Sequence, residues 1–369
     1  MAKDISAVHE PLIRIVKREP LPFGKSFLIR ALTILAAVIV ASVFIVSITG
    51  ANPVLVWSTM FRGVFKSTNV LWRFCRELAI LLGVALALTP AFKMRFWNIG
   101  GEGQIVIGGL ATYAVAMSFA GKLPMGVIVP LMLVAGIAAG AVWGAIPAIF
   151  KAFFGTNETL FTLMMNYVAM GLVTFCAITF KWEKIQGQTT LTVIDATTRL
   201  PKVINEHFLT IVAIAILTVG MYIYLKYTKQ GYEISVVGES ENTAKYVGIN
   251  VKKVIIRTML ISGAICGLIG FIKVSGFNWT VSTETGGGLG FTAIMVSWLA
   301  KFNPFSMVLT SGLLTFFQFG AKEVSQKFGY NEAFSEIITG IVLFFIIASE
   351  FFINYRIVLR KSAKGGKTE

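Results

Sequence analysis

Histidine, cysteine and charged side chains are scarce in this sequence of 369 residues. It contains 2 histidines and 3 cysteines, and only 14% of its residues are charged, whereas ordinary soluble domains carry about 25%. Cys75, Cys176 and Cys266 lie far apart, and neither His9 nor His207 stands beside a partner motif. A metal site, a disulfide framework and a histidine-based triad are therefore not expected, and no motif requires a cofactor.

Hydrophobic residues, by contrast, make up 56% of the chain, and the mean hydropathy is +0.76. A water-soluble core cannot absorb so much apolar surface. Helices that cross a bilayer can, because each needs about 20 mostly apolar residues and has no wet face to cover with charge. The sequence predicts an all-α, polytopic bundle of membrane helices, and it predicts a path for a solute rather than an enzyme.

The apolar runs predict about ten transmembrane helices. A further segment, 53–72, is only moderately apolar and carries Arg62 and Lys66, which indicates a helix lying in the membrane interface. The predicted spans are 27–48, 74–92, 98–120, 125–150, 159–180, 207–226, 255–275, 287–301, 304–320 and 334–353.

Basic residues indicate the orientation of the chain. The net charge is +15, and lysine and arginine gather near the N-terminus, around 226–257 and in the tail, as they do on the cytoplasmic side of membrane proteins. We therefore expect a cytoplasmic N-terminal segment (1–26), a transmembrane domain (27–353) with a cytoplasmic loop at 227–254, and a basic cytoplasmic tail (354–369). Because no basic stripe with interleaved aromatics is present, nucleic acid is not an expected partner.

Glycine recurs at helical spacing in two of the predicted spans. Gly136, Gly140 and Gly144 stand four residues apart, and Gly263 and Gly267 repeat the pattern. Such stripes allow neighbouring helices to approach closely, so we interpret both as packing surfaces. The run from Gly286 to Gly290 predicts either a broken or re-entrant helix, as transporters use around a cavity, or a plain loop.

Polar side chains interrupt two apolar runs, and they are the candidates for the substrate path. Polar groups are costly at membrane depth unless they face protein or water, so these side chains either line the path or its gate, or cap and join helices. The first stretch, 97–109, opens a span, whereas the members of the second stand four residues apart and share one helix face. The candidates are Asn98, Glu102 and Gln104 in the first stretch and Glu158, Thr162 and Asn166 in the second.

A third polar stretch, 238–250, lies in the predicted cytoplasmic loop. Ser240 is a suitable cap for a short helix, Glu241 suits the positive end of its dipole, and Gly248 suits its end. A short capped helix that projects from the membrane is either a docking element for another protein or a mere connector. The docking candidates are Gly238, Glu239, Ala244, Tyr246, Gly248, Ile249 and Asn250.

The three stretches together resemble those of permeases from bacterial ABC importers of the ribose and branched-chain amino acid branch, above all its nucleoside, or basic-membrane-protein-associated, group. The third span of that group opens with a pattern like Asn98-Ile99-Gly100-x-Glu102-Gly103-Gln104. The fifth has one like Asn157-Glu158-x-x-x-Thr162-Leu163-Met164-x-Asn166-Tyr167. A pattern like Gly238-x-x-x-x-x-Ala244-x-Tyr246-x-Gly248-Ile249-Asn250 occurs in the loop that docks on the ATPase.

The resemblance implies a multi-pass permease of the bacterial cell membrane that works by ATP-driven alternating access. Its implied partners are a second homologous permease, a cytoplasmic ABC ATPase that hydrolyses the ATP, and an extracytoplasmic substrate-binding lipoprotein. The implied solute is nucleoside-like, with riboflavin or a simple sugar as alternatives within the family.

An ion-coupled secondary transporter is the main alternative outside this family, because it too would be a helical bundle with polar groups near the midplane. Such carriers usually place carboxylates deep in the membrane. The acidic residues that adjoin the predicted spans all fall near span ends, which favours an external source of energy. These residues are Glu77, Glu102, Glu158, Glu336 and Glu350.

Overall fold

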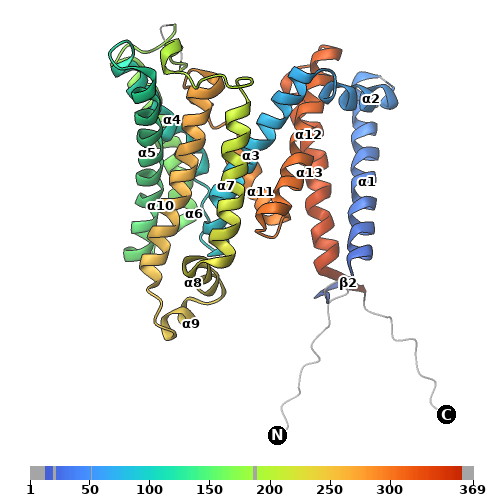
Figure 1. Ribbon diagram of the computed structural model, residues 1–369. Helices are drawn as coiled ribbons and strands as arrows, with labels where there is room; N and C mark the ends of the chain where they lie inside the picture. Colours follow the sequence, from blue (N-terminus) through green and yellow to red (C-terminus); the bar gives the residue numbers. More distant parts are fainter. Residues whose placement is uncertain (1–12, 20–21, 51, 186–188, 360–369) are drawn as a thin grey trace, which may run out of the picture. The chain divides into compact units, whose positions relative to one another are not determined.

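The computed structural model describes residues 13–19, 22–50, 52–185 and 189–359, and most of them are helical (Figure 1). The long elements are helices whose interiors are apolar, and several of them begin at a capping side chain, such as Ser67, Asn157 or Asn331. In chain order the elements are β1 (Ile13–Lys17), α1 (Phe23–Thr49), α2 (Pro53–Val64), α3 (Thr68–Lys93), α4 (Gly101–Phe119), α5 (Met125–Phe154), α6 (Glu158–Thr179), the 3-10 turn η1 (Ala196–Thr198), α7 (Phe208–Tyr227), α8 (Lys229–Glu239), α9 (Glu241–Tyr246), α10 (Val251–Phe271), the π-helix η2 (Ile272–Asn278), α11 (Leu289–Leu299), α12 (Pro304–Phe328), α13 (Glu332–Asn354) and β2 (Tyr355–Leu359).

Eight helices within the described residues are long and apolar enough to cross a membrane. They coincide with eight of the ten predicted spans, so the predicted polytopic helical bundle is confirmed. The matching helical segments are 24–48, 68–93, 125–154, 158–179, 208–227, 251–278, 304–328 and 336–354.

The other two predicted spans differ from the structure, one in its start and one in its length. The span predicted at 98–120 begins as non-helical chain, and its helix α4 starts only at Gly101. The span predicted at 287–301 contains α11, which has 11 residues and is therefore about 16 Å long. Since the hydrocarbon core is about 30 Å thick, α11 cannot cross it alone. Gly286, Gly287 and Gly288 form a turn that precedes this short helix, so the two alternatives for the Gly286–Gly290 run stay open.

The predicted interfacial helix at 53–72 is also two elements. Helix α2 ends at Val64, and Ser67 begins the next helix by accepting a hydrogen bond from the backbone N–H of Val70 at 3.3 Å. A serine in extended conformation is a good N-cap. Helix α3 thus starts six residues earlier than its apolar run suggests, because a cap rather than hydropathy sets its first residue.

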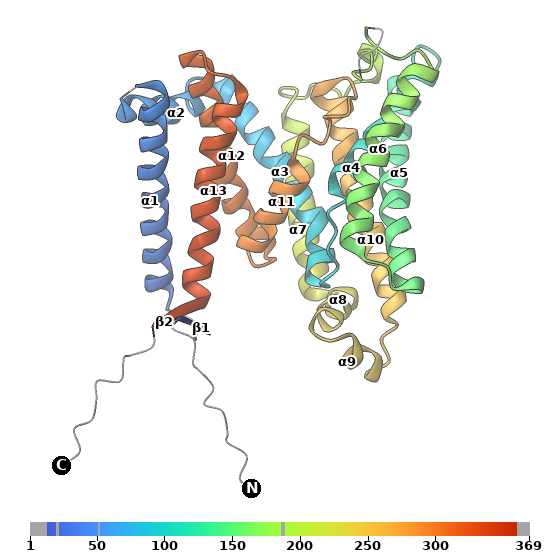
Figure 2. The same cartoon turned by 180° about the vertical axis from the view of Figure 1, so that it is seen from behind.

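The chain divides into two compact units, one formed by residues 1–61 together with 320–369 and one by residues 62–319, so that the boundaries fall inside α2 and α12. In the second unit α4, α5 and α10 pack together (Figure 2). Their glycines lie at the contacts. A Cβ on Gly140 would overlap the backbone of Gly263 and Gly267, and one on Gly108 would lie 2.5 Å from the Cα of Gly267. The predicted packing role of both glycine stripes is confirmed.

In the first unit α1 packs along α13. Ala37, Ala41 and Ile45 are buried at intervals of four residues, and Arg30 pairs with Glu350 across the two helices. Helix α2 is held by a hydrogen bond of 2.8 Å from the Trp57 indole to the Ser42 hydroxyl.

The first unit also contains two strands that an all-α prediction did not include. Strands β1 and β2 pair antiparallel, with Ile15 opposite Ile357, and the N–H of Arg18 extends the ladder to the carbonyl of Asn354. The pairing joins segments that are far apart in the chain, so no local sequence pattern predicted it. The predicted boundaries at residues 26 and 354 otherwise stay predictions, and residues 1–12 and 360–369 lie outside the described part.

Candidate functional site

The chain between α3 and α4 is non-helical from Arg95 to Asn98, and side-chain hydrogen bonds hold it. The side chain of Asn98 is fully buried. Its Oδ1 accepts from the N–H of Gly100 at 3.0 Å and from Nε2 of Gln104 at 3.3 Å, while its Nδ2 donates to the hydroxyl of Ser262 at 3.2 Å. Asn98 and Gln104 therefore join the start of α4 to α10.

The face of α6 predicted from the four-residue spacing meets the same segment. The Thr162 hydroxyl accepts from the N–H of Ile99 at 3.1 Å. The Asn166 amide accepts from the N–H of Gly103 at 2.8 Å and donates to the carbonyl of Ile99 at 3.0 Å. The amide thereby supplies partners for backbone groups that the interrupted helix leaves open, which a buried N–H or C=O requires.

Glu102 lies in the first turn of α4, and its carboxylate accepts a hydrogen bond from the N–H of Gly290 at 3.1 Å. That N–H belongs to the first turn of α11, where a negative charge is favourable. Glu102 is buried. It stands in the first turn of α4, as the sequence placed it near a span end. Burial within the protein does not measure depth in the membrane, so the expectation that no carboxylate lies deep stays a prediction.

Five of the six substrate-path candidates thus gather at the start of α4, and none of the five is more than 5% exposed. The sixth, Glu158, lies apart at the turn between α5 and α6, where it pairs with Lys151 at 2.7 Å. The interhelical hydrogen bonds that formed the alternative interpretation are present. Contact with a solute stays a prediction. The five gathered residues are Asn98, Glu102, Gln104, Thr162 and Asn166.

Helices α8 and α9 contain the docking candidates, and they lie beyond the ends of α7 and α10, at the lower end of the second unit in Figure 1. We call this the α9 end. Ser240 caps α9 by accepting from the N–H of Thr243 at 3.2 Å, and Gly248 ends the segment with a φ of 81°. Asn250 then caps α10 by accepting from the N–H of Lys253 at 3.1 Å. The predicted capped helix is confirmed.

The exposure of α9 is one-sided. Ala244 is fully buried, whereas Tyr246 is 91% exposed. Glu239, Gly248 and Asn250 are also exposed, and Ile249 is half-buried. A face of this kind leaves a large aromatic side chain in solvent at the tip of the unit.

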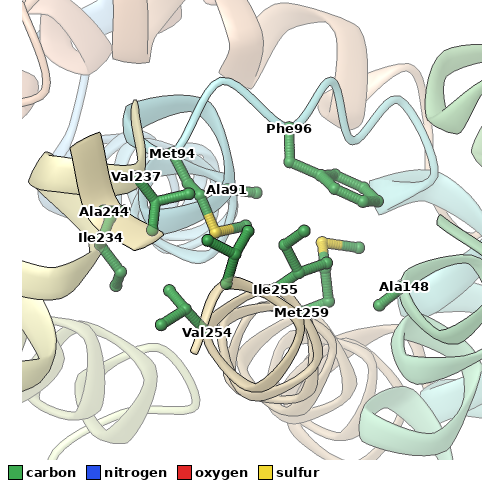
Figure 3. Close-up of a cluster of buried hydrophobic side chains, with 11 residues drawn as sticks. Ala91, Met94, Phe96, Ala148, Ile234, Val237, Ala244, Val254, Ile255 and Met259 are labelled. Atoms are coloured by element: carbon green, nitrogen blue, oxygen red, sulfur yellow. The ribbon is translucent and has the colours of Figure 1, made fainter. Parts of the chain in front are cut away.

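A hydrophobic cluster fixes α8 and α9 to the bundle (Figure 3). Ala244 of α9 and Ile234 and Val237 of α8 belong to one cluster with Met94 at the end of α3 and with Val254 and Ile255 of α10. A Cβ on Gly238 would overlap the carbonyl of Lys93, so only glycine allows α8 to lie this close to α3. Displacement of α8 and α9 would therefore act directly on α3 and α10, since packed apolar side chains have no slack.

The opposite end of the unit has a pocket of about 470 Å³ lined by Asn69, Trp72, Arg73, Lys202, Asn205, Glu206 and His207. His207 is buried there, with Nδ1 at 3.5 Å from the Arg76 guanidinium and Nε2 at 3.7 Å from the Glu206 carboxylate. Burial, and then the positive charge of Arg76, lower the pKa of His207 from its ordinary value. Sequence reasoning did not single out this pocket, because its residues come from two distant segments.

Lys273 is a second feature that sequence reasoning missed. It lies in the π-helix η2, is 8% exposed, and donates to the carbonyl of Gly286 at 3.4 Å. A lysine inside an apolar run was a usable signal, since buried charges in membrane segments are functional by default.

Residues 70–347 match the family described as branched-chain amino acid transport system / permease component. The chain belongs to this permease family. The match contains the interrupted start of α4, the polar face of α6 and the α8–α9 segment.

Three relatives resemble the permease over most of its length. The guanosine ABC transporter permease protein NupP of Bacillus subtilis is 30% identical, and the alignment covers 88% of this chain and 94% of that one. The nucleoside ABC transporter permease protein NupB of Lactococcus lactis is 28% identical, with 86% and 90% covered. The glucose ABC transporter permease protein TsgB13 of Haloferax volcanii is 28% identical, with 96% and 95% covered.

The prediction of an ABC importer permease from the ribose and branched-chain amino acid branch is confirmed at the level of the family. The permease is a multi-pass protein of the cell membrane and a transport component, not an enzyme, and such permeases work with ATPase and substrate-binding partners.

Proposed function

We propose that this permease forms half of the translocation path of an ABC importer for a nucleoside-like solute. The observation that carries the solute class is the similarity to the guanosine and nucleoside permeases, which extends over 88% and 86% of this chain. Riboflavin and simple sugars are the alternatives, and the glucose relative supports the second of them.

The proposed partners are a second homologous permease, a cytoplasmic ABC ATPase and an extracytoplasmic substrate-binding lipoprotein. The α9 end is the proposed contact with the ATPase. The basic residues near both ends of the chain support the proposal that both termini are cytoplasmic. The exposure of Tyr246 and the anchoring of Ala244 support this assignment. An element that is exposed on one side and packed into the bundle on the other can transmit a displacement caused by the ATPase to α3 and α10.

The proposed mechanism is alternating access. Movement of α8 and α9 would tilt α10. The hydrogen bond from Asn98 to Ser262 of α10 would then displace the start of α4 as well. The five polar residues gathered at the start of α4, Asn166 among them, would then face the translocation path in one state and be shielded from it in the other. Buried networks of this kind have two discrete arrangements rather than a continuum, because a half-satisfied network is unfavourable.

An ion-coupled carrier is the second candidate function, and one observation favours it. Glu102 is a buried carboxylate inside the second unit, and proton- and sodium-coupled carriers use such groups. Membership in the permease family supports the ATP-driven importer instead.

Co-purification of the tagged chain in mild detergent, with partners identified by mass spectrometry, tests the assembly. We expect an ATPase, a second permease and a lipoprotein. Uptake of a radiolabelled nucleoside by cells tests the solute, and excess unlabelled nucleosides should compete while riboflavin and glucose should not. A chain that purifies alone and moves solute down an ion gradient in liposomes would contradict the importer, and competition by glucose alone would contradict the nucleoside.

A further inference from the structure

Two buried charges of opposite sign meet the same glycine turn. The Lys273 ammonium donates to the carbonyl of Gly286 at 3.4 Å, and the Glu102 carboxylate accepts from the N–H of Gly290 at 3.1 Å. Their residues are 8% and 5% exposed. Charges inside a membrane domain are unfavourable unless they are held by partners. Here the hydrogen-bond partners are backbone groups of one five-residue segment, and the two opposite charges also attract each other.

The turn leaves room for the Glu102 carboxylate because glycines stand at positions 286 and 290. A Cβ on Gly286 would overlap the Glu102 carboxylate, and one on Gly290 would lie 3.0 Å from Cγ of Glu102. Gly287 and Gly288 have φ angles of 67° and 70°, a region that residues with a Cβ adopt at a cost. The turn is therefore shaped to place the first N–H groups of α11 on Glu102.

The two charges belong to one packed block. Glu102 stands at the start of α4, and Lys273 stands near the far end of the continuous helical segment 251–278. Helices α4, α5 and α10 are in backbone contact through their glycines, so they have little freedom to slide against one another. A displacement of α10 at the α9 end would consequently reach Lys273 and Glu102 together.

Helix α11 is the partner of the α4–α5–α10 block in this contact, because the N–H of Gly290 in its first turn donates to Glu102. It has 11 residues and ends in the Lys301–Phe302 turn, where both residues have positive φ. Before it, the chain from Trp279 to Val281 is tied to the loop at Leu191 and Ile194 by backbone hydrogen bonds of 2.8 and 2.9 Å. A short helix with a hinge-like turn at each end can change its tilt without unfolding.

We propose that Glu102 and Lys273 are the positioning residues that couple the α4–α5–α10 block to the half-helix α11. The charges hold the Gly286–Gly290 turn in the state described here, and α11 moves with the block during transport. This inference rests on the proposed importer function but assigns a role to residues outside the ATPase contact and leaves the identity of the solute open.

The test follows α11 by the reactivity of one cysteine. Cys75→Ser, Cys176→Ser and Cys266→Ala remove the native thiols, and Glu284→Cys places a thiol on the exposed chain just before the turn. The complete complex is placed in nanodiscs, and its labelling by a maleimide is timed with and without vanadate-trapped ATP. Lys273→Met and Glu102→Gln remove each charge with little change in shape. Lys122→Met is the matched control, because it removes an exposed charge in the loop between α4 and α5, away from α11.

We expect the reference and the Lys122→Met complex to change their labelling rate on trapping. The Lys273→Met and Glu102→Gln complexes should lose most of that change, and their uptake should fall on the order of tenfold, although their ATPase partner still co-purifies. If Lys273→Met does not fold, Lys273→Arg, which keeps the charge, should retain the change and Lys273→Gln should lose it.

Variants with unaltered uptake and an unaltered change in labelling would overturn the inference. A reference chain that recruits no ATPase and takes up no nucleoside would instead count against the proposed function, so the two failures are distinguishable.

Discussion

The side-chain amide of Asn166 on α6 bridges two backbone groups of the interrupted segment before α4, because it accepts from the N–H of Gly103 and donates to the carbonyl of Ile99. One side chain thus does what a continuing helix would do for its own backbone. The bridge explains why an amide stands inside an apolar helix whether or not a solute ever reaches it.

Replacement of Asn166 by leucine should lower stability. The change leaves the N–H of Gly103 and the carbonyl of Ile99 without partners, and a buried unpaired group costs about 1–3 kcal/mol. Thermal unfolding of the purified permease in detergent measures the effect. Thr174→Val is the control, because Thr174 lies on the same helix and its hydroxyl bonds only to the carbonyl of Met170. An unchanged melting temperature for Asn166→Leu would remove the bridge as a stabilising feature.

Replacement of Gly140 by valine should prevent normal assembly of the bundle. A Cβ at this position overlaps the backbone of α10, and overpacking of a tight contact costs about 1–3 kcal/mol or more. Gly126→Val is the matched control, since Gly126 lies on the same helix with open space around it. The yield of monodisperse protein after detergent extraction should fall for the first variant only. Equal yields would show that α5 and α10 can separate without loss.

Gly248→Arg should abolish uptake without preventing membrane insertion. Gly248 has a φ of 81° and open space around it, so arginine adds about 1–2 kcal/mol of backbone strain and a bulky charge at the proposed ATPase contact. Gly121→Arg is the control, because Gly121 has a φ of 72° and equally open surroundings in the loop between α4 and α5. Uptake and ATPase co-purification are both measured. Normal transport by Gly248→Arg would contradict the docking assignment.

Stability should decrease as the pH falls below about 6.5, the ordinary pKa of histidine, in part because of His207. Burial and Arg76 lower the pKa of His207 in the folded state, so the unfolded chain binds the proton more readily. The stabilising contribution is complete above the ordinary pKa and is lost as the pH falls through it toward the lowered value. His207→Gln should therefore show a smaller difference in melting temperature between pH 7.5 and pH 5.5 than the unaltered permease. Equal differences would mean that His207 does not contribute.

Much of the fold is already decided by local sequence. Apolar runs of bilayer length predict about ten spans because a helix satisfies its own backbone, and eight of them are long helices in the described residues. Ser240 and Gly248 predict the two ends of a short helix because a cap needs only neighbouring backbone groups. The glycines at 136, 140 and 144 predict a close contact because residues four apart share one helix face, and glycines leave that face without side chains.

Other features depended on the tertiary structure. The sequence marked Glu102 and Asn166 as polar residues in unusual places. It did not tell whether they line a path or join helices, because that choice depends on where the neighbouring helices start. The pairing of β1 with β2, and the approach of Lys273 to Gly286, join segments whose contact leaves no local pattern. By itself the sequence determined the elements and the family motifs through interactions over a few residues. Only the tertiary structure decided which buried charges share a turn, because long-range packing, rather than any local preference, brings Glu102 and Lys273 to it.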